Sequence, residues 1–199
     1  ETIGSDGPCK PDIDPRDHLV VLRDQGPRPR LLGFLTMRTV NSSGLYEALG
    51  DTQLANDIRR RTAGRIQLLT GIHVVHSSGG NYDVGQLLLT EALFHGMGQD
   101  CSYAVWHPNA PGTPPQILDL LKRQGFVETA NGASPLLLVD MRSPAILLQN
   151  IPTTLKEPFS SDRRVREAVR SAHFRIQEAI CGLYPGARGF TPSRVVQRP

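Results

Sequence analysis

The sequence predicts an α/β (α+β) domain in which helices flank a sheet. Short apolar runs of strand length recur along the 199-residue chain, and longer segments with apolar residues at helical spacing lie between them. The 19 Gly and 16 Pro imply many turns and irregular connections, which argues against a compact helical bundle. A chain of this length is able to bury a substantial core in a single domain.

The overall composition indicates an ordinary soluble protein. With 39% hydrophobic residues, 21% charged residues and a formal charge of +3, it gives only a weak reason to expect an acidic partner. No apolar run approaches the length of a membrane span and no secretory signal is present, so we expect a cytoplasmic protein that does not contact a membrane. Because the chain begins with Glu1 instead of Met and ends on Pro199, we expect a fragment of a longer, multidomain polypeptide.

Disulfide and metal sites are not expected. The three cysteines are too widely separated for a disulfide framework or a metal-ligand cluster (Cys9, Cys101 and Cys181). Residues 1–17 are rich in glycine, proline and charge, which is typical of a flexible leader. The leader's aspartates lack the glycine and the final glutamate of a calcium loop, and we expect them to be solvated (Asp12, Asp14 and Asp17).

The domain begins with a predicted hairpin. His18–Arg23 and Leu31–Val40 have strand character, and the glycine- and proline-rich residues 25–30 between them predict a turn, so antiparallel pairing follows. The next segment, Ser42–Gly64, has apolar residues at helical spacing with Gly50 as an interruption. Three arginines at 59–61 end that helix, where they complement its dipole; solvation is the simpler interpretation, and binding of an acidic ligand is the alternative.

The centre of the chain combines a strand, a glycine-containing loop and a helix start. The apolar run Ile66–Val75 predicts a strand, residues 76–83 predict a loop, and the helix is expected to begin near Asp83, its N-cap. We expect this helix to be amphipathic and to end between Gly96 and Gly98. Because free N–H groups and the positive end of a helix attract anions, the stretch indicates a phosphorylated cofactor.

Two histidines lie near the end of this strand. His73 projects to the same face of a regular strand as Val75, whereas His76 lies where the strand runs into the loop. A histidine at a strand end is a candidate general base, although a single histidine is more often a satisfied polar residue.

The remaining pattern completes the domain and adds a helix. It predicts, in order, a strand at Cys101–Trp106, a rigid proline-rich loop, a helix from Pro115 to Gly125, an extended segment at Phe126–Glu128 and a buried strand at Leu136–Met141.

Residues 143–186 predict an extended segment and then an amphipathic helix over 162–183, with the apolar stripe Val165, Val169, Ala172, Ile176, Ile180 and Leu183. We expect this helix to dock on the domain or to pair with a second copy of the chain. Its arginines have ordinary density and no interleaved aromatic residues, so nucleic acid is not the expected partner. Residues 187–199 are typical of a flexible tail.

The order of these elements resembles that of the GNAT superfamily of acetyl-CoA-dependent N-acyltransferases. Val84–Leu89 looks like the family's Gly-hydrophobic-Gly stretch that runs into its central helix, and Leu120–Phe126 is similar to the characteristic segment before its penultimate strands. The likeness extends over residues 18–142, with an insertion at about 42–64. It implies a mixed, mostly antiparallel central sheet flanked by helices, to which the C-terminal helix is appended.

The resemblance also implies a site for acetyl-CoA or CoA and no metal. The pantetheine arm would pair like a short strand with the exposed edge near Val75, where a main-chain N–H would stabilise the oxyanion, and amides from about Gly80 to Gly85 would bind the pyrophosphate. The implied cofactor-binding residues are Val75, Gly80, Asn81, Tyr82, Asp83, Val84, Gly85, Gln86 and Asn109.

By the same resemblance, a primary amine of a small molecule or a peptide attacks the thioester directly in a ternary complex. His73 or His76 would take the amine proton. The family's frequent tyrosine acid falls at Leu121, which leaves Tyr82, Tyr103 or water to protonate the departing thiolate.

Departures from the family pattern favour an alternative function. Leu121 has no proton to donate, Asp83 stands where the family usually has its first glycine, and Gly80 stands where an arginine or glutamine is expected. A carboxylate near a pyrophosphate disfavours binding through like-charge repulsion. The alternative is therefore a catalytically degenerate GNAT-like module that serves binding or assembly within a larger protein.

Overall fold

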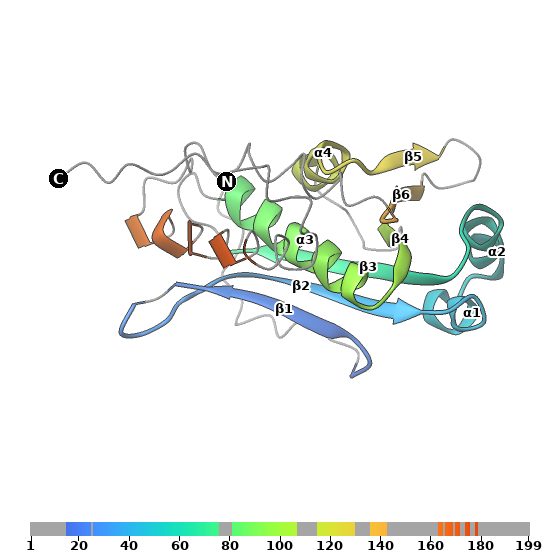
Figure 1. Cartoon of the computed structure of the whole chain (residues 1–199), viewed down its shortest axis with the longest axis horizontal. Helices are drawn as coiled ribbons and strands as arrows, with labels where there is room; N and C mark the ends of the chain where they lie inside the picture. The colour runs from blue at the N-terminus through green and yellow to red at the C-terminus, as the bar shows by residue number, and fades with distance from the viewer. Residues whose placement is uncertain are drawn as a thin grey trace, which may run out of the picture.

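The computed structural model describes residues 15–24, 26–75, 81–106, 115–129 and 136–142, together with a set of helical positions between Arg163 and Glu178. Within these residues the chain forms one six-stranded sheet in the order β1-β2-β3-β4-β6-β5 (Figure 1). The strands are β1 (His18–Arg23), β2 (Leu31–Val40), β3 (Arg65–Val74), β4 (Cys101–Trp106), β5 (Val127–Thr129) and β6 (Leu136–Asp140).

The sheet is mixed and mostly antiparallel. Only β3 and β4 run parallel, whereas the other four neighbouring pairs are antiparallel, including the predicted β1–β2 hairpin. The predicted fold class, a mixed and mostly antiparallel sheet flanked by helices, is therefore confirmed.

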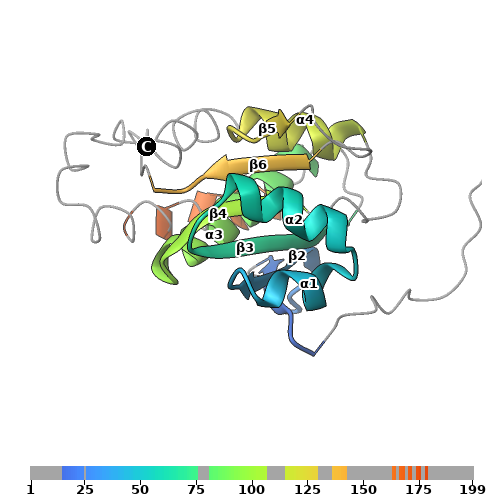
Figure 2. The same ribbon diagram turned by 90° about the vertical axis from the view of Figure 1, so that its right-hand side faces the viewer.

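Helices cover both faces of the sheet. The four helices with continuous bounds are α1 (Gly44–Leu49), α2 (Thr52–Arg61), α3 (Asn81–Gly98) and α4 (Pro115–Arg123). The main core lies between the sheet and α3 with α4, on what we call the α3 face. A smaller core lies under α1 and α2, on the opposite face, and Figure 2 views the molecule from that end.

The segment expected as an insertion forms α1 and α2, two helices instead of one interrupted helix. Gly50 adopts a left-handed conformation (φ 63°) at the C-terminus of α1, which a glycine accepts without steric cost. Asp51 then caps α2, because its carboxylate accepts a hydrogen bond from the Leu54 N–H at 3.0 Å.

The central helix α3 differs from its prediction in two respects. It begins at Asn81, so Asp83 already lies in the first turn and the expected N-cap role of Asp83 is wrong. The helix is also not amphipathic, since every residue from Val84 to Thr90 is buried. The sheet, α4 and the C-terminal helical segment all contribute side chains to the core around it, so no face of this stretch is left to carry polar residues.

The described part of the chain extends beyond the predicted domain at both ends. The carboxylate of Asp17 is only 7% exposed and pairs with Arg38, so the expectation that it is solvated is wrong. Near the C-terminus, Ala168 is 3% exposed and belongs to the main core. The six residues of the predicted apolar stripe lie outside the described residues, as do 1–14, 143–161 and the tail from 179 onward. No helix within the described residues has the length and hydropathy needed to span a membrane.

Candidate functional site

The described pairing of the parallel strands β3 and β4 covers only part of β3. Their pairing ends where Leu69 lies beside Trp106, but β3 continues to Val74 toward the start of α3 (Figure 1). From Thr70 onward, the edge of β3 that faced β4 has no partner strand among the described residues. We call this stretch the open edge of β3.

A β-bulge lies where the open edge begins. On the other side of β3, Met37 pairs with Leu69 and Thr36 pairs with Gly71, so Thr70 is an extra residue. A bulge bends its strand and increases the local twist, so the direction of β3 changes where the open edge begins. Hydrogen bonds join the Thr70 hydroxyl to Thr36 Oγ1 (2.9 Å) and to Asp17 Oδ2 (3.2 Å), and they hold the bulge in place.

At the open edge, two residues present backbone groups that have no strand partner within the described part of the chain. The N–H of Val75 donates to the Leu32 carbonyl of β2 at 2.9 Å, so this N–H is not free to stabilise an oxyanion. Because successive residues of a strand point their N–H and C=O groups to opposite edges, those of Ile72 and Val74 face away from β2. The backbone groups near the predicted position that face away from β2 are therefore those of Ile72 and Val74.

The side chains of this stretch divide between the two faces of the sheet. Ile72 and Val74 lie on the α3 face beside Gly85, where an added Cβ would come within 2.9 Å of Leu120 Cδ2 and 3.7 Å of Val74 Cγ2. Glycine thus lets α3 lie close to both α4 and the open edge. His73 is exposed on the opposite face and stacks on Phe34, with ring centroids 5.1 Å apart and an angle of 27° between the planes.

The first turn of α3 lies next to the open edge, as the contacts of Gly85 show. The N–H groups of Asn81–Asp83 have no acceptor within the helix, because the first turn of an α-helix lacks preceding carbonyls. The backbone N–H groups of Val84, Gly85 and Gln86 fall where helical acceptors exist, and all three residues are buried. The amides without an acceptor inside the helix as described are therefore those of 81–83.

Several predicted site residues lie outside the described part of the chain. His76, Gly80 and Asn109 belong to this group, as do the side chains of Asn81, Tyr82 and Asp83. The structure accordingly places Gly85 beside Ile72 and Val74, with Val84 and Gln86 also buried, whereas His73 and Val75 lie exposed on the opposite face of the sheet.

Neither Tyr103 nor Leu121 lies at the open edge. Tyr103 pairs with Ile66, near the N-terminal ends of β3 and β4, and its hydroxyl contacts Arg142 Nη2 at 2.9 Å. This placement removes Tyr103 from the candidate proton donors. Leu121 is 1% exposed within the main core, where it packs without reaching solvent.

Within the described ranges, the remaining titratable groups form no second catalytic centre. Burial raises the pKa of the Cys101 thiol, which keeps it protonated and unsuited to nucleophilic attack. Hydrogen bonds from Arg142 lower the pKa of Asp140, an exposed pair at the end of β6. Among the described residues, no three His, Cys, Asp or Glu side chains gather as metal ligands would.

Sequence reasoning missed the bulge, the Phe34 stack and the ion pair between Asp17 and Arg38. In that pair the Arg38 Nε donates to Asp17 Oδ1 at 2.8 Å, and the two side chains are 7% and 12% exposed. The Thr-Gly pair within an otherwise apolar strand was the available sign of a bulge, since glycine in a strand often marks one. Nothing local indicated the other two contacts, because they join separate strands.

Comparison with known proteins adds little. No protein-family model matches the chain. A search of curated proteins finds no match either. Among solved structures, the chain is similar to the crystal structure of a tyrosine-to-phenylalanine mutant of KacT, with a TM-score of 0.43 and 14% sequence identity over 67% of this chain and 75% of that chain. The case for a function rests on the geometry of the chain itself.

Proposed function

We propose that the chain is an acyl-CoA-dependent N-acyltransferase that transfers an acyl group, with acetyl as the simplest case, to a primary amine in a ternary complex. One observation carries the proposal: the open edge of β3 lies beside the first turn of α3. An edge with unpaired amides accepts an extended amide-containing chain, and a helix start accepts a phosphate.

The two parts of acyl-CoA match these two features. The amides of the pantetheine arm would pair with the backbone of Ile72 and Val74, and the pyrophosphate would lie at the free N–H groups of Asn81–Asp83. The proposal therefore uses fewer backbone N–H groups than the sequence predicted for the cofactor. The N–H of Val75 is left out because it donates to Leu32, and those of Val84, Gly85 and Gln86 are left out because they have acceptors within the helix. Gly80 and Asn109 lie outside the described residues and stay in the proposal as predicted cofactor-binding residues.

The reaction needs a base on the side of the sheet from which the amine approaches. In the proposed step, the neutral amine nitrogen attacks the thioester carbon, a C–N bond forms and the C–S bond breaks. His73, or His76 beyond the strand, takes the proton that the nitrogen loses and returns it to solvent. The departing thiolate gains a proton from Tyr82 or from water, so that an amide and free CoA result. A backbone N–H at the open edge would stabilise the oxyanion.

A catalytically degenerate module is the second candidate. The observation in its favour is Leu121, which is buried in the core at the position where the GNAT resemblance places a tyrosine acid. Without a positioned acid, the CoA thiolate leaves the thioester more slowly. A chain that kept only the open edge of β3 and the start of α3 would bind CoA without transferring the acyl group.

Calorimetric titration with CoA and acetyl-CoA tests the shared part of both candidates. We expect a dissociation constant on the order of micromolar, together with thermal stabilisation that rises with ligand concentration. Absence of both heat and stabilisation at millimolar ligand would remove the cofactor from the proposal. Binding without transfer to any amine would favour the degenerate module.

Substitution of the base separates binding from chemistry. We expect His73→Ala to lower the transfer rate by about 100-fold or more while the dissociation constant of CoA stays unchanged. His18→Ala is the matched control, since His18 is also an exposed strand histidine but lies on β1. Unchanged turnover in His73→Ala would assign the base to His76 or to water instead.

A further inference from the structure

On the face of the sheet opposite α3, the described helices α1 and α2 cover only one end. The smaller core under α1 and α2 takes in Val40, Ile66 and Leu68, near the N-terminal end of β3. Toward the open edge, large apolar side chains stay exposed on β1, β2 and the end of β3. They are Leu19 (46% exposed), Val21 (37%), Leu31 (40%) and Val75 (38%). We call these four residues and the half-buried Phe34 the apolar patch.

The apolar patch is continuous with His73. Val21 lies directly opposite Phe34 in the β1–β2 register, and Phe34 lies directly opposite His73 in the β2–β3 register. The three side chains therefore form one row across three strands on the same face. Because Phe34 stacks on the imidazole, the patch begins at the group that we propose as the base.

The charges around the apolar patch are unsuited to a polycation. Two carboxylates of the described residues flank it in the chain, and both are already paired: Asp17 with Arg38 and Thr70, and Asp24 with Arg30. The exposed Arg23 lies opposite Leu31 and adds positive charge at the other end of the patch. A second ammonium group on the acceptor would find repulsion there and no free carboxylate among the described residues.

We propose that the acceptor is a monoamine carried on a flat apolar body, an arylalkylamine being the simplest representative, and that the apolar patch is its binding surface. The inference rests on the proposed function. The ring of the substrate would lie along Val21 and Phe34, which leaves its amino group over His73 at the open edge. Binding would remove the ring and these side chains from water, and this burial of apolar surface favours an apolar acceptor.

Binding is tested first, with phenethylamine and spermidine as probes. The His73 ring proton signals in an NMR spectrum, assigned by their loss in His73→Gln, report on the patch with and without CoA. We expect phenethylamine to shift them at concentrations at least about tenfold lower than spermidine, which corresponds to the lower end of discrimination by an apolar surface. Equal responses to the two amines, or no response to either amine with CoA present and absent, would overturn the inference.

Transfer is tested next, with acetyl-CoA as the donor and mass spectrometry of the acetylated amine as the readout. We expect kcat/KM to be at least about tenfold greater for phenethylamine than for spermidine or ethanolamine. Val21→Glu should reverse or abolish this preference, since it places a carboxylate in the row that leads to His73. Val127→Glu is the matched control, because Val127 is 63% exposed on β5 at the other edge of the sheet.

The outcomes distinguish this inference from the proposed function. Transfer that favours spermidine or ethanolamine in the wild-type chain, or an equal effect of Val21→Glu and Val127→Glu, contradicts the apolar patch while acyl transfer stands. Binding of phenethylamine that Val21→Glu abolishes, in a chain that does not bind CoA, supports the patch and contradicts the acyltransferase.

Discussion

At the scale of single residues, Asp24 shows how one buried carboxylate closes the β1–β2 hairpin. It is 3% exposed and accepts hydrogen bonds from the Arg30 backbone N–H and from Arg30 Nε, both at 2.8 Å. These hydrogen bonds and the guanidinium charge lower the pKa of the Asp24 carboxyl below its ordinary value of 3.8. The turn over residues 25–30 was predictable from glycine and proline, but the pairing that fixes its shape was not.

This pairing predicts a dependence of stability on acid pH. Because the folded-state pKa of Asp24 lies below the unfolded-state value, the ionised carboxylate stabilises the fold above the ordinary value of 3.8, and the contribution is lost as the pH falls through the folded-state pKa. We expect Asp24→Asn to lower the urea midpoint at about pH 6 and to flatten its decline below about pH 4. Asp119→Asn, at an exposed carboxylate of α4, should follow the wild-type curve. Parallel curves for wild type and Asp24→Asn would contradict this assignment.

The candidate site was only partly predictable at this scale. Alternation along the strand correctly placed His73 on the same face as Val75, and both are exposed. Alternation within one strand says nothing of partners on others, so the contacts of His73 with Phe34 and of Arg38 with Asp17 required the sheet order. The sequence also could not show which backbone N–H groups are able to bind a ligand, because the acceptor of the Val75 N–H lies on another strand, β2.

At the scale of elements, strands with clear turn signals on both sides were predicted best. The predicted bounds of β1, β2 and β4 agree with the structure residue for residue. The helix α3 was predicted less well because burial on several sides removes the polar stripe that marks an amphipathic helix. Its close packing depends on glycines, whose role becomes evident only from the neighbouring elements.

Gly96 provides the test of this packing. An added Cβ there would lie 2.8 Å from Met141 Cε and would overlap Gln67, which is fully buried and donates to the Ala92 carbonyl at 2.7 Å. Since Gln67 cannot move without losing this bond, we expect Gly96→Ala to cost about 1–3 kcal/mol of unfolding free energy. In Gly98→Ala the new methyl meets no atom within 4 Å, so no loss is expected. Urea denaturation of the two variants measures the difference, and equal stabilities would refute the close contact.

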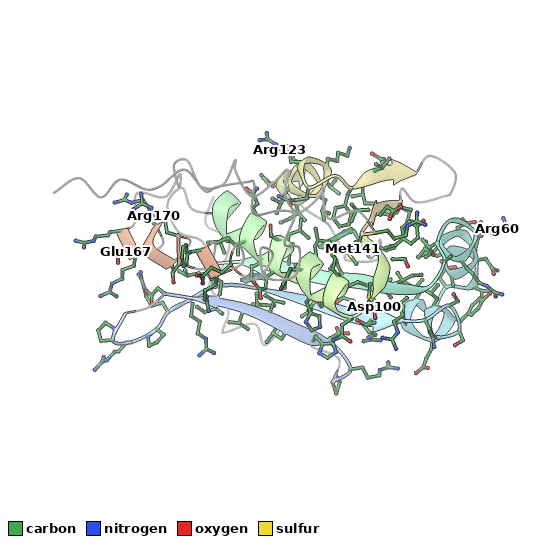
Figure 3. The ribbon with its side chains drawn as sticks, in the orientation of Figure 1. Arg60, Asp100, Arg123, Met141, Glu167 and Arg170 are labelled. Atoms are coloured by element: carbon green, nitrogen blue, oxygen red, sulfur yellow. The ribbon has the colours of Figure 1, made fainter. Side chains whose placement is uncertain are left out.

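At the scale of the whole molecule, the C-terminal helical segment shares the core of the domain. Ala168 is a member of the main core, and Arg175 lines a cavity of about 500 Å³ together with β1 and α3. Figure 3 places Arg60 at one end of the molecule and Arg170 at the other, with Arg123 on α4. These arginines are too far apart to form one basic surface, which keeps nucleic acid the less favoured partner.

A shared core predicts a single unfolding transition. We expect Ala168→Glu to lower the free energy of unfolding by about 2–3 kcal/mol, because it places a charge among apolar side chains. Arg170→Glu, on the exposed side of the same helix, should change it by less than about 0.5 kcal/mol. Thermal and urea melts of both variants check this, and a wild-type stability for Ala168→Glu would show that the segment folds apart from the domain.

The extra residue at Thr70 decides which side chains of β3 face α3 beyond the bulge. Gln67 and Leu69 face α3 before the bulge, and Ile72 and Val74 face it afterwards, so the inward positions are three residues apart at that point. If the same residues formed a regular strand, His73 would turn inward under α3 and Ile72 would turn toward solvent. If Thr70 were deleted instead, every side chain would keep its face, but the strand would lose the bend that the bulge gives it. Two chains that differ by this single residue would share their core and their fold, and they would differ in the direction that the last residues of β3 take.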